Sequence, residues 1–395
     1  MKVLIVTDFF GNDLTYIENE LAKQYVKFGL EVFVICSLTD NPFDFFNDTY
    51  HSHKKKSVQI SNGIKVYRLP YKINIKKRIK KFKGVYEILT LEKPDVIFFN
   101  SIQPDIKEAV KYKNETGCDI ILYSETDYSN SANNWVSLNV LHKIIWKTIF
   151  HKYKKHISKI FFATPASSDF LKNVYNISHN ETELLPLGCD YELSENVRNT
   201  FDRVAFRKKM GINNSDHVLI TGGKLNPKKK TEIVIEAVNM LKKSDLHLII
   251  FGTPDNGFEE YYEHLKKIGQ NVNIHFTGWL SPDSFYEYMA ISDIAVFPSS
   301  QSVLWQQAIG MHLPLIAGDS GWQDMSYLNF YDNIIKIEKE NITPIKFADA
   351  VNQLISSPED LIKMKKGAAK AAKEHLNYTI LAKKTLEGSD HNFSK

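Results

Sequence analysis

Two stretches of the sequence combine residue types that suit the binding of a phosphate group. The first, TGGKLNPKKKTEIVIEAV (221–238), places two glycines after an apolar run, then several lysines, and then a helical pattern of apolar residues. Flexible backbone and ammonium groups beside a helix N-terminus stabilise a diphosphate, because N–H groups and positive charge both face the anion. Lys224 and Lys229 are the candidate cations. A solvated turn rich in lysine is the alternative interpretation.

The second stretch, PSSQSVLWQQAIGMHLPLIAG (298–318), leaves a buried strand through a short polar loop and begins a helix. Ser302 is a suitable N-cap, and free amides in the first turn would complement a phosphate group. Gln301 and Gln307 add neutral hydrogen-bonding groups. The alternative is a buried helix with an ordinary serine cap.

Two carboxylates follow the apolar run DIILYS in the sequence YSETDYSNSANNW (123–135). At the edge of a sheet, Glu125 and Asp127 could face a reacting atom or bind a metal ion, or Asp127 could cap a local turn. Gly11, in the loop DFFGND, would allow a ligand to approach the backbone, although an ordinary strand-to-helix turn explains it equally well.

These residues need a scaffold that brings distant loops together, and the hydrophobic pattern predicts one. Apolar runs typical of strands buried on both faces alternate with helical stretches. Ile17, Leu21 and Tyr25 mark the first helix, which Gly29 ends. This alternation predicts an α/β fold with a parallel, doubly wound sheet. The predicted strands are KVLIVTDFF, LEVFVICSL, IKVYRLPY, PDVIFFNS, DIILYSE and ISKIFFATP.

A second series follows the segment ETELLPLGCDYEL (181–193), where a strand-like run meets Gly188 and polar residues. Since a chain of 395 residues exceeds what one core usually supports, we expect two such domains, with a ligand-binding cleft between the carboxyl ends of their sheets. The C-terminal stretch is helical, with no strand after it. The five predicted strands of the second series are DHVLITGGKL, LHLIIFGTP, VNIHFTGW, DIAVFPSS and LPLIAGDSG.

Composition narrows the class of protein. The chain is 43% hydrophobic and 24% charged with a net charge of +4, a mild basicity that does not call for nucleic acid. The start, MKVLIVTDFF, lacks the features of a secretory signal, and no apolar run approaches the roughly 18 to 20 residues that span a bilayer, so we expect a cytoplasmic protein. Cys36, Cys118 and Cys189 lack metal-ligand spacing and suit reduced thiols.

Two basic segments interleave aromatic and aliphatic residues at helical spacing, YKINIKKRIKKFKGVY (71–86) and LHKIIWKTIFHKYKKHISK (141–159). Basic amphipathic helices lie on anionic lipid surfaces, so Lys76, Lys77, Lys80 and Lys81 are candidates for contact with the inner face of a membrane. The alternative is a solvated charged face. Nucleic acid is a poorer partner, because no recognition motif accompanies the charge.

Together, these stretches resemble the GT-B glycosyltransferases of glycosyltransferase family 4, also called group 1, over nearly the whole chain. GGKLNPKKKTEIVIEA is similar to the family's Gly-Arg-Leu-x-x-x-Lys-Gly loop, with Lys224 at the arginine position, Lys229 at the lysine position and Lys230 in place of glycine. QQAIGMHLPLIA resembles Glu-Ala-Met-Ala-x-Gly-x-Pro-Val-Ile. LLPLGCD resembles the interdomain Pro-x-Gly-x-Asp. HFTGW resembles the family's Phe-x-Gly segment, and SDIAVFPSS resembles its Ala-Asp strand that leads to Pro-Ser.

The sequence departs from the family at its Glu-x7-Glu pair. Gln307 occupies the place of the second glutamate, the shorter loop leaves no clear counterpart for the first, and His312 replaces a glycine. By resemblance, the second glutamate binds the donor ribose and the first contacts the donor sugar. A glutamine amide still hydrogen-bonds to a diol, without the strength of a charged acceptor. The identity of the donor, and activity itself, therefore stay open.

The resemblance implies a retaining, metal-independent enzyme without a cofactor. It would move a sugar from a nucleotide-diphosphate sugar, with a UDP-sugar favoured, to a glycan or lipid-linked acceptor in bacterial surface polysaccharide synthesis. Residues 1–187 would bind the acceptor, with the C-terminal helix 375–395 packed back on them, and residues 188–374 would bind the donor. Lys224 and Lys229 would act on the leaving group, with Glu125 and Asp127 at the reacting carbon. The donor-binding residues would be Gly11, Gly223, Gly252, Trp279, Gln301, Ser302, Val303 and Gln307.

Two alternatives remain at this stage. The missing glutamates are typical of a degenerate transferase that only binds a nucleotide sugar or a glycan. A sugar-nucleotide epimerase of related two-domain shape would act on the free donor without an acceptor.

Overall fold

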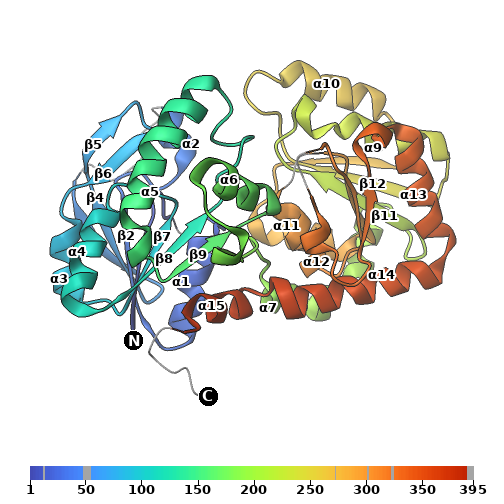
Figure 1. The fold of residues 1–395 in the computed structure, drawn as a ribbon. Helices are drawn as coiled ribbons and strands as arrows, with labels where there is room; N and C mark the ends of the chain where they lie inside the picture. Colours follow the sequence, from blue (N-terminus) through green and yellow to red (C-terminus); the bar gives the residue numbers. More distant parts are fainter. Residues whose placement is uncertain (12–13, 48–54, 272, 300–301, 322–323, 389–395) are drawn as a thin grey trace. The chain divides into compact units, whose positions relative to one another are not determined.

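The computed structural model describes residues 1–395 apart from 12–13, 48–54, 272, 300–301, 322–323 and 389–395 (Figure 1). The chain divides into two compact units, Met1–Leu187 with Tyr378–Lys395, and Gly188–Asn377. Each unit has its own mainly parallel sheet between helices, which confirms the α/β, doubly wound architecture.

The sheet of the first unit has the strand order β10-β9-β8-β7-β1-β2-β4-β3. All neighbours pair in parallel except β3 and β4, which form an antiparallel hairpin at one edge. The prediction of a purely parallel sheet is therefore wrong at this edge. The strands are β1 (Lys2–Val6), β2 (Glu31–Ser37), β3 (Ser57–Ser61), β4 (Ile64–Leu69), β7 (Val96–Asn100), β8 (Asp119–Ser124), β9 (Lys159–Phe162) and β10 (Glu183–Leu184).

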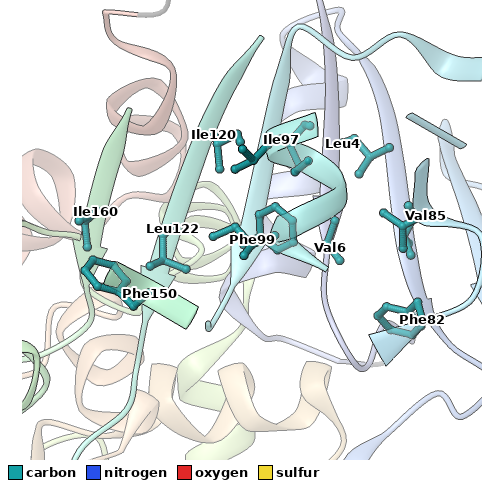
Figure 2. Packing of buried hydrophobic residues seen from close by; sticks show 14 of the residues in the cluster. Leu4, Val6, Phe82, Val85, Ile97, Phe99, Ile120, Leu122, Phe150 and Ile160 are labelled. Atoms are coloured by element: carbon teal, nitrogen blue, oxygen red, sulfur yellow. The ribbon is translucent and has the colours of Figure 1, made fainter. Parts of the chain in front are cut away.

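Alternate residues of the central strands face opposite layers of helices. Leu4, Val6 and Phe99 belong to the core shown in Figure 2, which Val85 and Phe150 complete from the helical layer on that face. Their neighbours in sequence belong to a second core on the other face. The helices of this unit are α1 (Ile17–Lys27), α2 (Pro42–Asn47), α3 (Val85–Glu92), α4 (Ile106–Thr116), a π-helix (Ser137–Trp146) that continues as α5 (Lys147–Tyr153), α6 (Pro165–Tyr175) and α15 (Tyr378–Leu386).

Helix α15 completes the second core of the first unit, although it lies at the far end of the sequence. Tyr378 and Leu381 are buried in that core together with residues of α1. The hydroxyl groups of Tyr25 and Thr385 lie 2.6 Å apart, and Lys384 donates to the carbonyl oxygen of Leu184 at 2.7 Å. The first unit is therefore built from both ends of the chain.

The basic segment 71–86 is not an amphipathic helix, so that prediction is wrong. It forms an antiparallel hairpin of β5 (Tyr71–Ile75) and β6 (Ile79–Phe82), whose turn places Lys76 and Lys77 at φ of 50° and 57°. They are the central residues of the β-turn Ile75–Arg78, in which the N–H of Arg78 donates to the carbonyl oxygen of Ile75 at 3.0 Å. A turn with positive φ at both central residues matches the twist of paired strands.

The second basic segment is helical, as predicted, but its aromatic residues do not face a membrane. Trp146 is 7% exposed and Phe150 is fully buried in the core of the first unit. These two aromatic rings therefore stabilise the fold, and Lys147, the lysine between them, is partly buried.

The sheet of the second unit is entirely parallel and has the strand order β13-β12-β11-β14-β15-β16. This is the Rossmann order, in which the first strand of the unit lies in the middle. The sequence predicted its first five strands and missed β16, which is short and only partly buried. The strands are β11 (His217–Gly222), β12 (Leu246–Phe251), β13 (Ile274–Gly278), β14 (Ile294–Phe297), β15 (Leu315–Gly318) and β16 (Ile334–Ile337).

Helices α9 and α13 pack their apolar residues on one face of this sheet, where Val234, Val238 and Phe347 join the strand residues in one core. The helices of the second unit are α7 (Tyr191–Thr200), α8 (Arg203–Lys209), α9 (Thr231–Leu241), α10 (Glu259–Ile268), α11 (Pro282–Ile291), α12 (Val303–Gly310), α13 (Pro344–Ser356), α14 (Pro358–Ala371) and a π-helix (Ala372–Leu376).

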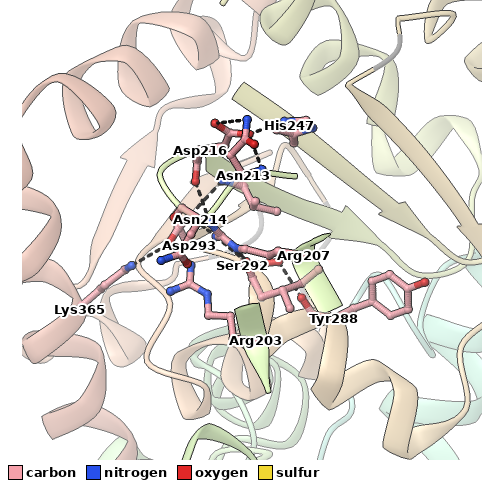
Figure 3. A network of polar contacts seen from close by, with 12 residues as sticks. Arg203, Arg207, Asn213, Asn214, Asp216, His247, Tyr288, Ser292, Asp293 and Lys365 are labelled. Carbon is pink, nitrogen blue, oxygen red and sulfur yellow. Dashed lines mark hydrogen bonds and ion pairs between the residues drawn. The ribbon is translucent and has the colours of Figure 1, made fainter. Parts of the chain in front are cut away.

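A buried ionic network anchors α8 to this sheet (Figure 3). The Arg207 guanidinium, 1% exposed, donates to the carbonyl oxygen of Ile291 at 2.9 and 2.6 Å and to that of Asp216 at 2.8 Å. It also donates to Asp293 at 2.7 Å. Burial alone would raise the pKa of Asp293, but Lys365, Arg203 and Arg207 together lower it well below its usual range. Asp293, the residue before β14, is therefore ionised at neutral pH.

Candidate functional site

The two sequence stretches that suit phosphate binding meet at the centre of the second sheet. Strands β11 and β14 are neighbours there. The strands that follow β11 in sequence extend the sheet to one side, and those that follow β14 extend it to the other. Such a switch point, at the carboxyl ends of the strands, is where ligands bind in doubly wound folds. A Cβ atom on Gly223, just after β11, would lie 3.1 Å from Cδ1 of Leu304 in the first turn of α12. The glycine turn and the start of α12 are therefore in contact.

Glycine is required where these strand ends converge. Gly223 has a φ of +115° and donates its N–H to the carbonyl oxygen of Phe251 at 3.0 Å. Gly252 has a φ of +111°, and its N–H donates to the carbonyl oxygen of Gly278 at 2.7 Å. A Cβ on Gly252 would lie 1.8 Å from the carbonyl oxygen of Gly223. The ends of β11, β12 and β13 thus present a backbone edge without side chains, which a ligand can approach closely.

The lysine loop follows this edge as one tight turn. Asn226 caps the 3₁₀ turn Pro227–Lys229 by accepting the N–H of Lys228 at 3.1 Å, and Lys230 takes a left-handed φ of 53° before α9 begins. The glycine of the family motif suits this conformation better than a lysine does.

The two candidate cations differ in environment. Lys224 is exposed and lies 3.7 Å from the carboxylate of Asp255. Lys229 is half-buried, and burial lowers the pKa of its ammonium group. Because desolvation disfavours the charged form, an anion bound beside Lys229 would gain more from it than from a fully solvated lysine.

Helix α12 starts as predicted. The Ser302 side chain accepts the N–H of Leu304 at 3.4 Å, which confirms its role as N-cap, and Val303 is the first helical residue. Gln307 lies one turn further along and is 7% exposed. Gln301 lies outside the described residues.

Sequence reasoning missed the neighbouring Gln306. This side chain is fully buried, accepts the N–H of Gly188 at 2.6 Å and lies 3.5 Å from the hydroxyl of Tyr327. It ties α12 to the first residue of the second unit. The Gln-Gln pair in the sequence gave no sign of which member faces inward.

Trp279 follows Gly278 at the end of β13 and is 66% exposed. A large aromatic side chain in that position is available to stack on a base or a sugar ring. It lies at the same carboxyl edge of the sheet as Gly223 and Gly252, since all three follow parallel strands of one sheet.

In the first unit, Asp127 has a local partner for its carboxylate. Its Oδ1 accepts the N–H of Ser129 at 2.7 Å, the hydroxyl of Ser129 at 2.7 Å and the N–H of Asn130 at 2.9 Å. These bonds form a side-chain-capped turn, which favours the capping interpretation. Gly11 also has a local role, because its carbonyl oxygen accepts from Asn19 at 2.9 Å and from the N–H of Leu14 at 3.2 Å.

Glu125 has an unusual environment for a carboxylate. Burial and the nearby Glu18 raise the pKa of Glu125 to about 7. Sequence reasoning missed Glu18, which lies in the first turn of α1, is 2% exposed and accepts the Thr7 hydroxyl at 2.9 Å. Burial raises the pKa of Glu18 as well. The two acids are a perturbed pair at the carboxyl edge of the first sheet, an arrangement that is common at functional sites.

The described residues contain no group of three or more His, Cys, Asp or Glu side chains placed to hold a metal ion. In the same part of the chain, none of the helices has the length and apolar character needed to cross a bilayer.

Comparison with solved structures defines the class of fold. The chain is similar to a glycosyltransferase from Rickettsia africae, with a TM-score of 0.70 and 14% identity over 98% of this chain and 97% of the other. It is also similar to the Anabaena HepE protein in complex with UDP, with a TM-score of 0.69 and 15% identity over 98% and 99% of the two chains. The fold is therefore the GT-B fold of glycosyltransferases, with two Rossmann-like units.

Comparison of sequences defines the second unit more closely. Residues 202–371 match the family described as glycosyl transferases group 1. The matching segment covers most of the second unit and includes the glycine edge, the lysine loop and α12. A curated relative, the GDP-mannose-dependent monoacylated alpha-(1-6)-phosphatidylinositol monomannoside mannosyltransferase of Corynebacterium glutamicum, is 26% identical over 36% of this chain and 40% of its own length. The matches span about half or less of the curated relatives, from 40% to 52% of their lengths.

Proposed function

We propose that the chain is a glycosyltransferase that takes its sugar from a nucleotide-diphosphate sugar, with a UDP-sugar favoured. One observation carries the proposal: the Gly223 turn touches the first turn of α12 inside the segment that matches the glycosyltransferase family. This contact brings a side-chain-free backbone edge and a helix N-terminus together at the switch point of a Rossmann-like sheet. Both favour a diphosphate, because backbone N–H groups and the positive end of a helix face the anion.

In the proposed reaction, the nucleoside diphosphate is the leaving group and the protein stabilises the charge that develops on it. The amide of Val303 in the first turn of α12 donates a hydrogen bond, since the Ser302 side chain accepts that of Leu304, and Lys224 and Lys229 supply positive charge. Fixed donors and charges of this kind are worth about 3 to 4 kcal/mol each in a site shielded from water. They perform the task that a divalent cation performs elsewhere, so the proposed enzyme is metal-independent and uses no cofactor.

The acceptor hydroxyl attacks from the face that the leaving group departs from, which retains the configuration of the sugar. We place the acceptor at the carboxyl edge of the first sheet and the donor on the second unit. Trp279, Gln307 and Gly252 are the proposed contacts to the base, the ribose and the phosphates of the donor, and Ser302 orients the helix. Glu125 is the carboxyl group that we place nearest to the acceptor hydroxyl.

The proposed acceptor is a glycan or a lipid-linked intermediate of bacterial surface polysaccharide synthesis, handled by a cytoplasmic enzyme that docks on the inner membrane face. The tip of the β5–β6 hairpin suits such docking, since Ile73 and Ile75 are 40% and 53% exposed beside the exposed Lys76. Lys80 and Lys81 contribute less to this surface, because they form ion pairs with Asp8 and Glu108.

A binding protein without transferase activity is the second candidate, and one observation favours it. Gln307 occupies the position where the family has a carboxylate for the donor ribose, and its neutral amide is buried, so the ribose would lose a charged acceptor. Such a protein would bind the nucleotide sugar and leave it intact.

The test is a thermal-shift screen of the full chain against UDP, GDP, CMP and their sugars, followed by product analysis. A ligand present at 100 times its Kd stabilises the folded state by about 2.7 kcal/mol, so selective binding raises the melting temperature clearly. Transfer to an added acceptor supports the proposed function, and binding without turnover supports the second candidate. No shift with any nucleotide would refute both.

A further inference from the structure

One helix of the first unit leaves a row of apolar side chains exposed. The π-helix Ser137–Trp146 follows directly after two of them and continues as α5 (Figure 1). We call the row the apolar stripe: it consists of Trp135, Val136, Val140 and Ile144, which are 71%, 61%, 38% and 58% exposed. The last three are spaced by four residues, which places them on one side of a helix. Exposed apolar side chains that gather in one place indicate an interaction surface.

The inner side of the same helix is already packed. Leu138, Leu141 and Ile145 pack against the core of the first unit. His142 is 2% exposed, and its Nδ1 lies 2.6 Å from the Tyr175 hydroxyl. These contacts fix the rotation of the helix about its axis, so the apolar stripe is held on the outer side and is not part of the core.

The chain around the apolar stripe is strongly basic. Residues 128–168 contain six lysines and no aspartate or glutamate. Lys154 pairs with Glu181, whereas four others form no ion pair with any described residue: Lys143, Lys147, Lys152 and Lys155. Lys143 and Lys147 follow Val140 and Ile144 by three residues, so they flank the stripe. Apolar and basic side chains on one helix suit an anionic membrane, because the apolar groups enter the boundary of headgroups and acyl chains while the ammonium groups reach the lipid phosphates.

A second copy of this chain fits the apolar stripe less well than a membrane does. A two-fold symmetric contact places the same surface of both copies face to face. Lys143 and Lys147 of the two copies would then meet, and like charges brought together at an interface weaken binding. An anionic lipid surface has the opposite charge, so the basic residues beside the stripe favour it as the partner.

The same helix also lines a pocket of about 190 Å³ at the carboxyl ends of β1 and β7. Leu141, His142 and Trp146 line it from the helix, Asp8 follows β1, and Asn100 ends β7. The apolar stripe lies on the other side of this one helix, whose width is about 10 to 12 Å. A surface that contacts the stripe is therefore close to the sheet edge where we place the acceptor.

We propose that the apolar stripe inserts into the headgroup region of an anionic membrane, with Trp135 at the interface and Lys143 and Lys147 on the lipid phosphates. The inference rests on the proposed function, because it names the surface through which that enzyme reaches a lipid-linked acceptor. It makes this helix the main contact and the tip of the β5–β6 hairpin a secondary one, since the hairpin exposes two isoleucines and the stripe exposes four apolar residues that include a tryptophan.

The experiment measures co-sedimentation of the full chain with vesicles of phosphatidylcholine alone and with about 30% phosphatidylglycerol. We expect binding to the anionic vesicles to be at least about tenfold stronger, because each lysine near the surface adds to the attraction, and to weaken as the salt concentration rises. Brominated lipids should quench the tryptophan emission of the wild type. The quenching should be lost in Trp135→Leu, which still binds the vesicles because leucine is apolar. Quenching that persists in this variant would contradict the insertion of Trp135.

Two variants of matched exposure make the test specific. Ile144→Ser should weaken vesicle binding about fivefold or more, because burial of an isoleucine side chain contributes at least this factor. Val204→Ser changes a residue of the second unit that is 57% exposed, and it should leave vesicle binding unchanged. Unchanged melting temperatures show that both variants are folded.

Several outcomes would overturn the inference. They are equal weakening by Ile144→Ser and Val204→Ser, weakening by Ile75→Ser alone, equal binding to neutral and anionic vesicles, and no binding to either. A dimer in solution that Ile144→Ser abolishes would also overturn it, in favour of a second copy of the chain.

UDP binding by the same samples separates this inference from the proposed function. UDP reports on the second unit, so intact UDP binding without vesicle binding contradicts only the docking surface. Vesicle binding without UDP binding contradicts only the proposed donor.

Discussion

Replacing Arg207 by methionine should destabilise the second unit by about 4 kcal/mol. Methionine fills much of the same volume without donors, so the buried carbonyl oxygens of Ile291 and Asp216 lose their partners. Each of the two buried acceptors left without a partner costs about 1 to 1.5 kcal/mol, and the lost charge-assisted bond to Asp293 adds about 1.5 kcal/mol. The sum lies within the range of about 3 to 5 kcal/mol known for breaking a buried ion pair on one side.

Arg203 offers a matched control. It donates to the same Asp293 carboxylate at 2.7 Å, but its side chain is 38% exposed and it carries one ion pair of the network. Partly exposed pairs contribute about 1 kcal/mol or less, so Arg203→Met should cost far less than Arg207→Met. Asp293 remains paired with Lys365 at 3.0 Å in both variants.

Hydrogen exchange read peptide by peptide is the appropriate assay, because the chain has two units and a single unfolding transition is not assured. In peptides from β11 and β14, a loss of 4 kcal/mol lowers the protection against exchange about a thousandfold. Peptides from β1 and β7 in the first unit serve as the internal reference. A loss below about 1 kcal/mol, or an equal loss in the two variants, would refute the assignment of these energies to buried bonds.

Three further predictions concern the candidate sites. Gly252→Ala should lower the melting temperature of the second unit and weaken UDP binding, because the new Cβ would lie 1.8 Å from a carbonyl oxygen; the expected cost in stability is above about 2 kcal/mol. The control is Gly257→Ala, whose Cβ would have no atom within 4 Å and which should cost about 1 kcal/mol. Lys229→Ala should lower kcat/KM by an amount that corresponds to about 2 to 4 kcal/mol of transition-state stabilisation, whereas Lys228→Ala, which changes an exposed neighbour, should have little effect. The activity of the unmodified protein should be the same with and without EDTA. The pKa of Glu125 is raised to about 7 in the folded state, so its contribution to stability is present at low pH and is lost as the pH rises through 7. Between pH 5 and 8, the melting temperature should therefore fall less for Glu125→Gln than for the wild type. An equal fall in the two proteins would contradict the assigned pKa.

The sheets could be predicted from the sequence because their strands are buried on both faces. Strands such as Val96–Asn100 and Leu246–Phe251 are almost entirely apolar, a pattern typical of strands that are buried on both faces. Strand β16 was not predicted, because it is short, lies at the edge of the sheet and is only partly buried: Ile335 is half-buried and Lys336 is exposed.

The β5–β6 hairpin could not be distinguished from a helix by its apolar residues. Ile75, Ile79 and Phe82 follow a spacing that fits one face of a helix, and the alternation on each strand is too short to outweigh it. The decisive feature is the turn, where Lys76 and Lys77 adopt positive φ values. Lysine gives no signal for such a turn, because asparagine and glycine usually occupy it.

The candidate sites were only partly predictable for a related reason. The Ser302 cap is a local feature, and local features can be read from neighbouring residues. The approach of Gly252 to Gly223 joins strand ends 29 residues apart, which only the folded sheet brings together. Glu18 likewise looks like an ordinary acidic residue in the first turn of a helix, and only its burial beside Thr7 sets it apart.

The position of α15 in the first unit affects the order in which the units fold during synthesis. A ribosome releases the chain from its N-terminus, so residues 1–187 emerge first but lack Tyr378, Leu381 and Leu386, which belong to their core. Residues 188–377 are continuous and complete their own unit earlier. Until the final helix leaves the exit tunnel, the nascent first unit exposes the apolar surface of α1, and general chaperones bind such surfaces. Truncation before residue 378 would make that transient exposure permanent, so insoluble protein is the expected product of a premature stop there.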